Sequence, residues 1–90
     1  MLTPRASHQY KKDLRAAERQ HKPIARLDEA LALLVSGQPL PRSYRDHPLK
    51  GAWRGFRELH IAPDWLLIYR IEGDELLLAG LGSHAELFGE

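Results

Sequence analysis

The sequence contains no cysteine, which excludes disulfide bridges and thiolate metal ligands and is typical of proteins from a reducing compartment. It also has no apolar run that approaches the roughly 20 residues of a membrane-spanning helix. Its first seven residues lack the apolar segment of an export signal. From these absences we expect a cytoplasmic protein that does not enter a membrane.

Catalytic signatures of several enzyme classes are missing as well. The sequence has no glycine-rich phosphate loop and no serine nucleophile elbow. Its 90 residues suit one small domain with a modest core, so we expect residues 1–90 to form a single domain. A bound partner would add substantially to the stability of such a core.

The charges are divided unevenly along the chain. Residues 1–57 hold twelve Lys and Arg against five Asp and Glu, whereas residues 58–90 hold one against seven. The densest basic stretch, residues 42–57, combines cations with rings that can stack on unpaired bases: Arg42, Arg45, Lys50, Arg54 and Arg57, with Tyr44, Trp53 and Phe56. It is either a site for a polyanion or a solvated surface that pairs with the acidic half.

Apolar residues at helical spacing predict a first helix from about Ser7 to Gln20 and a second that begins near Pro23 and stops at Gly37. Because only a few residues separate them, the two helices are expected to pack as an antiparallel hairpin. The joint apolar face of this hairpin needs a further layer to cover it.

Three later segments, residues 56–61, 65–71 and 75–81, are rich in aromatic, β-branched and leucine residues and are separated by turn signals, which predicts antiparallel strands. Residues 2–4 add a possible edge strand, and Ser83 can cap a short helical turn that ends the chain. The predicted fold class is therefore α+β: an N-terminal antiparallel helical hairpin on a small, mainly antiparallel sheet of three or four strands, with a short C-terminal helical turn.

Three of the five histidines, His47, His60 and His84, lie in the second half of the chain together with Asp64. Imidazoles move protons near pH 7, which RNA cleavage without a metal requires. Each also has a structural interpretation: His47 can cap a loop, His60 can be a partly buried strand end, and His84 can be an ordinary residue of the final turn. A zinc site is a poor fit, since these histidines are 13 and 24 residues apart. We expect no metal and no cofactor.

Two segments carry a family resemblance: DHPLKGAWRGFRELHIAPDWLLIYRI at residues 46–71 and GSHAELFG at residues 82–89. Together they resemble the YafQ branch of the RelE/ParE toxin superfamily, and the likeness covers nearly the whole chain. The resemblance implies a RelE-like fold and a ribosome-dependent mRNA endonuclease, the toxin of a bacterial type II toxin–antitoxin module. It implies the ribosome, mRNA and a cognate DinJ-like or RelB-like antitoxin as partners.

The resemblance also implies functional positions. The three histidines are His47 in a loop, His60 at a strand end and His84 near the C-terminus. The others are the acidic–aromatic pair Asp64 and Trp65 and the terminal aromatic Phe88. One position differs, because such toxins usually have an arginine four residues before the C-terminal histidine, where this chain has Gly80. Arg54, Arg57 or Arg70 could supply that cation instead, with Lys50 as a further substrate contact. Strand alternation sets Arg70 on the face opposite Trp65, so only one of these two can face the site.

RNA provides its own nucleophile, so a metal-free nuclease needs a base for the 2′-OH, an acid for the leaving 5′ oxygen and a cation for the phosphate. We assign His84 as the acid and Asp64 or His60 as the base, with His47 at the phosphate or in the proton relay. Trp65 and Phe88 would stack on bases, although Phe88 could equally anchor the C-terminus in the core.

Two alternatives to the nuclease remain at this point. The first is a non-catalytic protein on the same scaffold, either a gyrase poison or an inactivated nuclease that is retained for antitoxin binding. The second is a small basic RNA-binding domain without a partner. Gly80 favours the first alternative, and the retained histidines argue against it.

Overall fold

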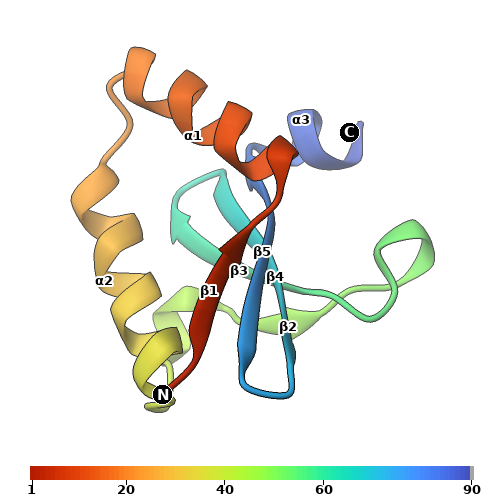
Figure 1. Cartoon of the computed structure of the whole chain (residues 1–90). Coiled ribbons are helices and arrows are strands. Elements are labelled where there is room, and N and C mark those ends of the chain that lie inside the picture. Colours follow the sequence, from red (N-terminus) through yellow and green to blue (C-terminus); the bar gives the residue numbers. More distant parts are fainter. Residues whose placement is uncertain (90) are drawn as a thin grey trace.

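A computed structural model describes residues 1–89 of the chain. The elements follow one another as β1 (Thr3–Ala6), α1 (His8–Arg19), α2 (Ile24–Ser36), the 3-10 turn η1 (Arg42–Tyr44), β2 (His47–Pro48), the 3-10 turn η2 (Gly51–Trp53), β3 (Arg57–Ala62), β4 (Trp65–Glu72), β5 (Glu75–Gly82) and α3 (His84–Phe88). Figure 1 shows the long helices α1 and α2 on one side of the twisted sheet, α3 at its upper end, and the segment between β2 and β3 projecting from it as a loop. No helix in the described range is long and apolar enough to cross a membrane.

The sheet has the order β1-β5-β4-β3-β2. The strand β1 runs parallel to β5, and the other neighbours are antiparallel. The predicted hairpin turn forms at Gly73, whose φ of 61° is a conformation that glycine adopts without a steric penalty. The α+β class and the mainly antiparallel sheet are confirmed. The predicted strand count of three or four was slightly low, because the two-residue β2 and the parallel β1 bring it to five.

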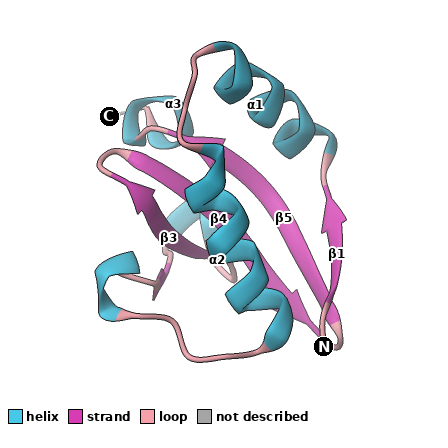
Figure 2. Cartoon of the chain, turned by 90° about the vertical axis from the view of Figure 1, so that its left-hand side faces the viewer, coloured by secondary structure: helices cyan, strands magenta, loops and turns pink. Residues whose placement is uncertain are grey.

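The two long helices begin and end where the sequence predicts. The Ser7 hydroxyl accepts a hydrogen bond from the backbone N–H of Tyr10 at the start of α1, and Gly37 closes α2 in the left-handed conformation. The two helices follow each other across a short connection, in agreement with the predicted helical hairpin, and α1 lies against β5 whereas α2 lies near β3. Figures 1 and 2 show the two helices inclined to each other, so each covers its own part of the sheet.

Side chains alternate between the two faces of β3 and β4. The core cluster under the helices includes Leu59, Ile61, Trp65, Leu67 and Tyr69. The intervening residues Glu58, His60, Leu66, Ile68 and Arg70 therefore point to the other face. This alternation places two candidate chemical groups, Glu58 and His60, together on the face that the long helices leave open.

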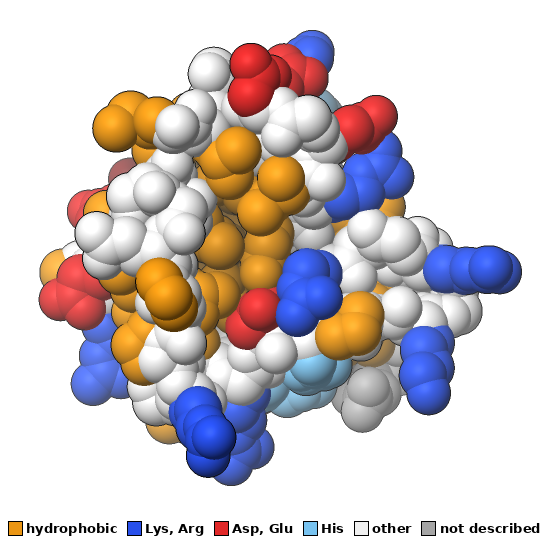
Figure 3. All heavy atoms as spheres, turned by 90° about the horizontal axis from the view of Figure 1, so that it is seen from below, with side chains coloured by type: hydrophobic (Ala, Val, Ile, Leu, Met, Phe, Trp, Pro, Cys, Tyr) orange, Lys and Arg blue, Asp and Glu red, His pale blue; other side chains and the backbone are white. Residues whose placement is uncertain are grey.

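A hydrogen-bond network ties the segment before β2 to the sheet. Asp46 accepts two hydrogen bonds from the Arg57 guanidinium, at 3.2 and 3.0 Å, and another from the Tyr69 hydroxyl. These residues border a hollow of about 500 Å³ whose apolar lining includes Leu34 and Ile71. Figure 3 shows such a hollow from below, with apolar side chains inside it and charged side chains at its rim. The network fixes the chain immediately before His47.

Candidate active site

Three histidines from distant parts of the chain meet at one end of the open face. His47 lies in β2, His60 in β3 and His84 in the first turn of α3. The ring centroids of His47 and His60 are 6.4 Å apart, and those of His60 and His84 are 5.7 Å apart. The three histidines predicted to act together are thus close neighbours, which is the arrangement that proton transfer to and from one substrate needs.

A buried carboxylate lies among these rings. The side chain of Glu58 is only 5% exposed, and its Oε1 lies 3.5 Å from Nε2 of His47, 3.9 Å from Nε2 of His60 and 4.0 Å from Nε2 of His84. We did not predict Glu58 as a site residue. Its position two residues before His60, on the same face of a strand, is the sequence signal that could have indicated it.

Asp64 holds His84 in place. Its Oδ1 accepts a hydrogen bond from the His84 backbone N–H at 2.9 Å and lies 2.7 Å from the His84 Nδ1. Asp64 occupies the tight turn between β3 and β4 with a left-handed φ of 52°. The hydrogen bonds from the His84 backbone and ring lower the pKa of Asp64, so this carboxylate stays ionised. An ionised acceptor favours the tautomer with a proton on Nδ1 and turns Nε2 toward the site.

His47 and His60 have different environments. The His47 Nδ1 lies 2.6 Å from the carbonyl oxygen of Arg45, and because a carbonyl only accepts, Nδ1 carries the proton. Burial has the largest effect on the pKa of His60 and lowers it, whereas the negative charge of Glu58 acts to raise it. The Nδ1 of His60 is buried without a hydrogen-bond partner in residues 1–89. His60 is therefore mainly neutral at neutral pH, the state that a general base requires.

The two aromatic candidates, Trp65 and Phe88, differ in burial and in distance from the histidines. Trp65 is 3% exposed and belongs to the core cluster, so its predicted role in stacking on bases is replaced by a structural one. The Phe88 ring lies beside His84, with centroids 6.2 Å apart, and is half-buried. Of the two, Phe88 is the one that a substrate at the histidines could reach.

The basic candidates lie in different parts of the structure. Arg57 is held by Asp46 and Tyr69 on the side of the sheet that carries the core, away from the histidines. Arg70 is on the open face, where its guanidinium lies 5.0 Å from the centroid of the Phe56 ring and pairs with Glu72. Lys50 and Arg54 are exposed on the projecting loop. Arg57 therefore belongs to the network on the core side, whereas Arg70, Lys50 and Arg54 lie outside that network.

One group of donors could hold a metal ion. A carboxylate oxygen of Glu58 and one nitrogen each of His60 and His84 lie within 4.8 Å of one another. One carboxylate and two imidazoles form a donor set that suits Zn²⁺ or Cu²⁺. The sequence spacing alone had argued against a metal site, because it does not reveal that β3 and α3 bring these side chains together.

Comparison with known families identifies the class of this α+β protein as the toxins of bacterial type II toxin–antitoxin systems. Residues 2–89 match the family model described as "Bacterial toxin of type II toxin-antitoxin system, YafQ". The chain belongs to the YafQ toxin family.

Relatives and solved structures agree with this placement. The chain is 44% identical over 84 residues to the mRNA interferase toxin YafQ of Escherichia coli (strain K12), covering 92% of this chain and 91% of the relative. A crystal structure of the E. coli DinJ–YafQ complex superposes with a TM-score of 0.91 at 39% identity and covers 99% of this chain and 100% of that one. A metal-bound toxin from Helicobacter pylori superposes with a TM-score of 0.91 at 42% identity, covering 98% and 100%.

Proposed function

We propose that the chain is an mRNA endonuclease that cleaves messages on the ribosome and is silenced by an antitoxin. The observation that carries this proposal is the convergence of His47, His60 and His84 around Glu58, with Asp64 holding His84. The relative named an mRNA interferase toxin supports RNA as the substrate. A non-catalytic toxin would have no need of such a proton-transfer cluster.

The nucleophile in this proposal is the 2′-OH of the message. His60 takes its proton, because the lowered pKa of this histidine keeps it neutral near pH 7. The resulting 2′ oxygen attacks the adjacent phosphorus, and the bond from phosphorus to the 5′ oxygen breaks. The products are a 2′,3′-cyclic phosphate and a 5′-OH, so no water or oxidant is consumed in this step.

His84 is the general acid in this proposal. The carboxylate of Asp64 accepts from its Nδ1 and fixes the ring, which leaves Nε2 to protonate the departing 5′ oxygen. This geometry makes Asp64 a positioning residue for the acid rather than the base, so of our two candidates for the base we retain His60.

Cations must stabilise the charge that develops on the phosphate, and removal of one such donor typically costs about 10²–10³ in rate. The usual arginine is replaced by Gly80, where a Cβ would lie 3.3 Å from Leu87 and 3.7 Å from the Asp13 carboxylate. We assign the task to His47 and to Arg70, the basic candidate on the strand face that carries His60. Lys50 and Arg54 would hold more distant phosphates.

Metal-free chemistry is sufficient for this reaction, and we propose that the enzyme works without a cofactor. An ion bound by Glu58, His60 and His84 would supply a Lewis acid at the phosphate. It would also occupy imidazole nitrogens, because a coordinated nitrogen cannot exchange a proton with the RNA.

The ribosome and an antitoxin are the proposed partners, which places the protein in the cytoplasm. The histidines lie on the sheet face that the long helices leave uncovered, and so small a domain offers little surface to hold a long message, so the ribosome would position it. The similar E. coli toxin forms a complex with DinJ, which supports an antitoxin partner for this chain. The excess of cations in residues 1–57 would attract an acidic inhibitor.

A modified message tests the proposed reaction. The purified protein is incubated with an mRNA on programmed ribosomes, with the same mRNA free in solution, and with a ribosome-bound mRNA that carries one 2′-deoxynucleotide at the cleavage position. We expect cleavage only of the unmodified ribosome-bound message, with a cyclic phosphate end. Cutting at the deoxynucleotide would refute attack by the 2′-OH, and equal cutting of free mRNA would refute ribosome dependence.

A further inference from the structure

A cavity of about 580 Å³ opens directly beside the histidines and extends away from them toward α2. One end is lined by His60, Asp64 and His84, and the other by Arg26, Glu29 and Tyr44. Its volume falls within the range of roughly 300–1,000 Å³ that is typical of sites for small ligands. A chain whose scissile phosphate lies at the histidines would therefore continue into an open cleft of suitable size.

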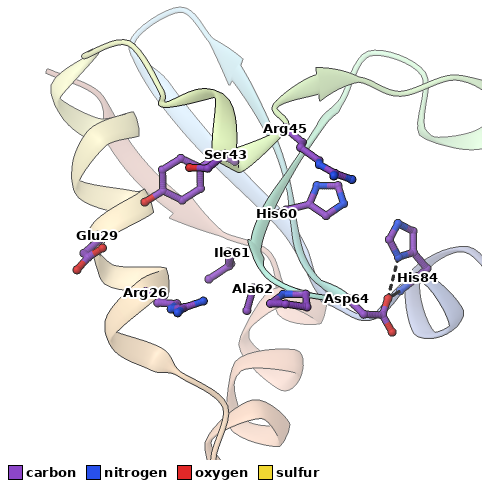
Figure 4. A pocket seen from close by; sticks show the side chains of 11 residues that line it. Arg26, Glu29, Ser43, Arg45, His60, Ile61, Ala62, Asp64 and His84 are labelled. Carbon is purple, nitrogen blue, oxygen red and sulfur yellow. Dashed lines mark hydrogen bonds and ion pairs between the residues drawn. The ribbon is translucent and has the colours of Figure 1, made fainter.

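Two arginines border this cavity and have no ion-pair partner among residues 1–89. Arg26 comes from α2 and Arg45 follows η1, and both side chains are exposed. In the described part of the chain neither guanidinium forms an ion pair or a hydrogen bond. Figure 4 shows Arg26 reaching from the helix toward Ala62 and Arg45 lying beside the His60 ring. Two unpaired guanidiniums near a nuclease site are suited to phosphate.

One wall of the cavity is apolar, although Glu29 and Ser43 also line the cavity. Tyr44 is half-buried and packs against the core, so its ring is held in place. Ile61, Ala62 and Pro63 form the adjacent lining. A fixed aromatic ring beside aliphatic groups offers a nucleobase a surface on which to stack, and proteins that bind single-stranded nucleic acids use aromatic side chains in this way.

On these grounds we propose that the cavity binds the nucleotide of the message that adjoins the scissile phosphate. Arg26 and Arg45 contact the neighbouring phosphate, and Tyr44 stacks on the base. This inference rests on the proposed nuclease function and adds to it a subsite that can discriminate among messages. None of these three residues is part of the proton-transfer cluster, so their removal acts on substrate binding.

Cleavage kinetics on programmed ribosomes test the cationic part. Arg26→Gln and Arg45→Gln are expected to raise KM about tenfold each, because a charge-assisted hydrogen bond is lost, while kcat stays within about twofold. Arg5→Gln is the matched control, since it removes one exposed arginine far from the cavity. Because the Arg45 charge also lowers the pKa of His60, the assay is run at pH 8, where His60 is neutral in every variant. KM values equal to that of Arg5→Gln would overturn the proposal.

A substrate with one neutral linkage distinguishes contact with mRNA from contact with ribosomal RNA. A methylphosphonate is placed at the linkage on the 5′ or the 3′ side of the scissile phosphate. At one of these positions the neutral linkage should raise KM for the wild type, and Arg26→Gln should then cause no further loss. Additive effects at both positions would show that Arg26 binds something other than the message, and would overturn the subsite.

A double-mutant cycle that combines Tyr44 variants with a modified message tests the proposed stacking. Tyr44→Phe should retain wild-type KM, whereas Tyr44→Ala should raise it about tenfold on a normal message and leave it unchanged on one with an abasic neighbour. Circular dichroism and Tm confirm that Tyr44→Ala is folded. Equal losses on both messages would refute stacking. If the wild type cleaves no message at all, it is the nuclease function that fails, and the two failures are thereby distinguished.

Discussion

Asp64 and His84 are joined by two contacts to a single oxygen, since Oδ1 of Asp64 lies 2.9 Å from the His84 backbone nitrogen and 2.7 Å from its Nδ1. The pair links the turn between β3 and β4 to the first turn of α3. It sets the position and the tautomer of the proposed general acid together. The two residues are 20 positions apart in the chain, with β4 and β5 between them, so the contact depends on the register of these two strands.

Substitution of Asp64 by asparagine tests this relationship. The amide oxygen can still accept from the backbone N–H, but the negative charge that favours a proton on Nδ1 is lost. We expect kcat to fall by about 10²–10³ with KM nearly unchanged, because the loss concerns a step after binding. Single-turnover cleavage on ribosomes measures this. A higher KM with normal kcat would show that Asp64 binds substrate and does not position the acid.

The pH dependence of cleavage reports on His60. A base acts when neutral, so the rate falls as the pH drops through its pKa. Because burial lowers the pKa of His60, the acidic limb should lie below its ordinary value of 6.5. The Glu58 charge raises this pKa, and Glu58→Gln should therefore move the limb to still lower pH. Glu18→Gln, an exposed control on α1, should leave it in place. A limb that does not move in Glu58→Gln would contradict this assignment of the base.

The Asp46 network has a predicted effect on stability. Asp46→Ala leaves the Arg57 guanidinium and the Tyr69 hydroxyl without their shared acceptor, and Tyr69 is only 2% exposed. We expect the free energy of unfolding to fall by about 1–3 kcal/mol. Glu75→Gln, which breaks the exposed Arg5–Glu75 pair, should change it by under about 1 kcal/mol. Urea denaturation measures both, and equal losses would show that the network does not stabilise the fold.

Metal ions should inhibit the enzyme. A chelator such as EDTA, added with enough Mg²⁺ to keep the ribosomes intact, should leave cleavage unchanged, because proton transfer by histidine needs no ion. Added Zn²⁺ or Cu²⁺ should slow cleavage by occupying the nitrogens of His60 and His84. Glu58→Ala removes one donor and should weaken this inhibition. Loss of activity with the chelator and its recovery with Zn²⁺ would contradict a metal-free reaction.

Much of the fold follows from local sequence signals. The Gly73 turn, the Ser83 cap and the alternation along β3 and β4 are each specified by residues close together in the chain. The capping box of Ser83 and Glu86 in particular forms as such a sequence indicates. The inclination of α1 to α2 was not predictable in this way, because it depends on which part of the sheet each helix covers.

The candidate site could be predicted only in part, because local sequence signals identify reactive side chains but not which of them the fold brings together. His47, His60, His84 and Asp64 have side chains whose chemistry is recognisable without a structure, and the fold brings them together. Alternation of side chains along β4 showed that Trp65 and Arg70 lie on opposite faces, but only the structure shows that Trp65 is on the core face. Arg26 of α2 lines the far end of the neighbouring cavity, a placement that no local sequence pattern encodes.

Cleavage of an mRNA on purified translating ribosomes by the wild type and by His84→Ala tests the central claim most directly. We predict that the wild type cuts the message and that His84→Ala, although folded and still able to bind the programmed ribosome, cuts it at least about 10²-fold more slowly. An unchanged rate in His84→Ala would contradict the assignment of the acid. An intact message with the wild type would show that the scaffold serves binding alone.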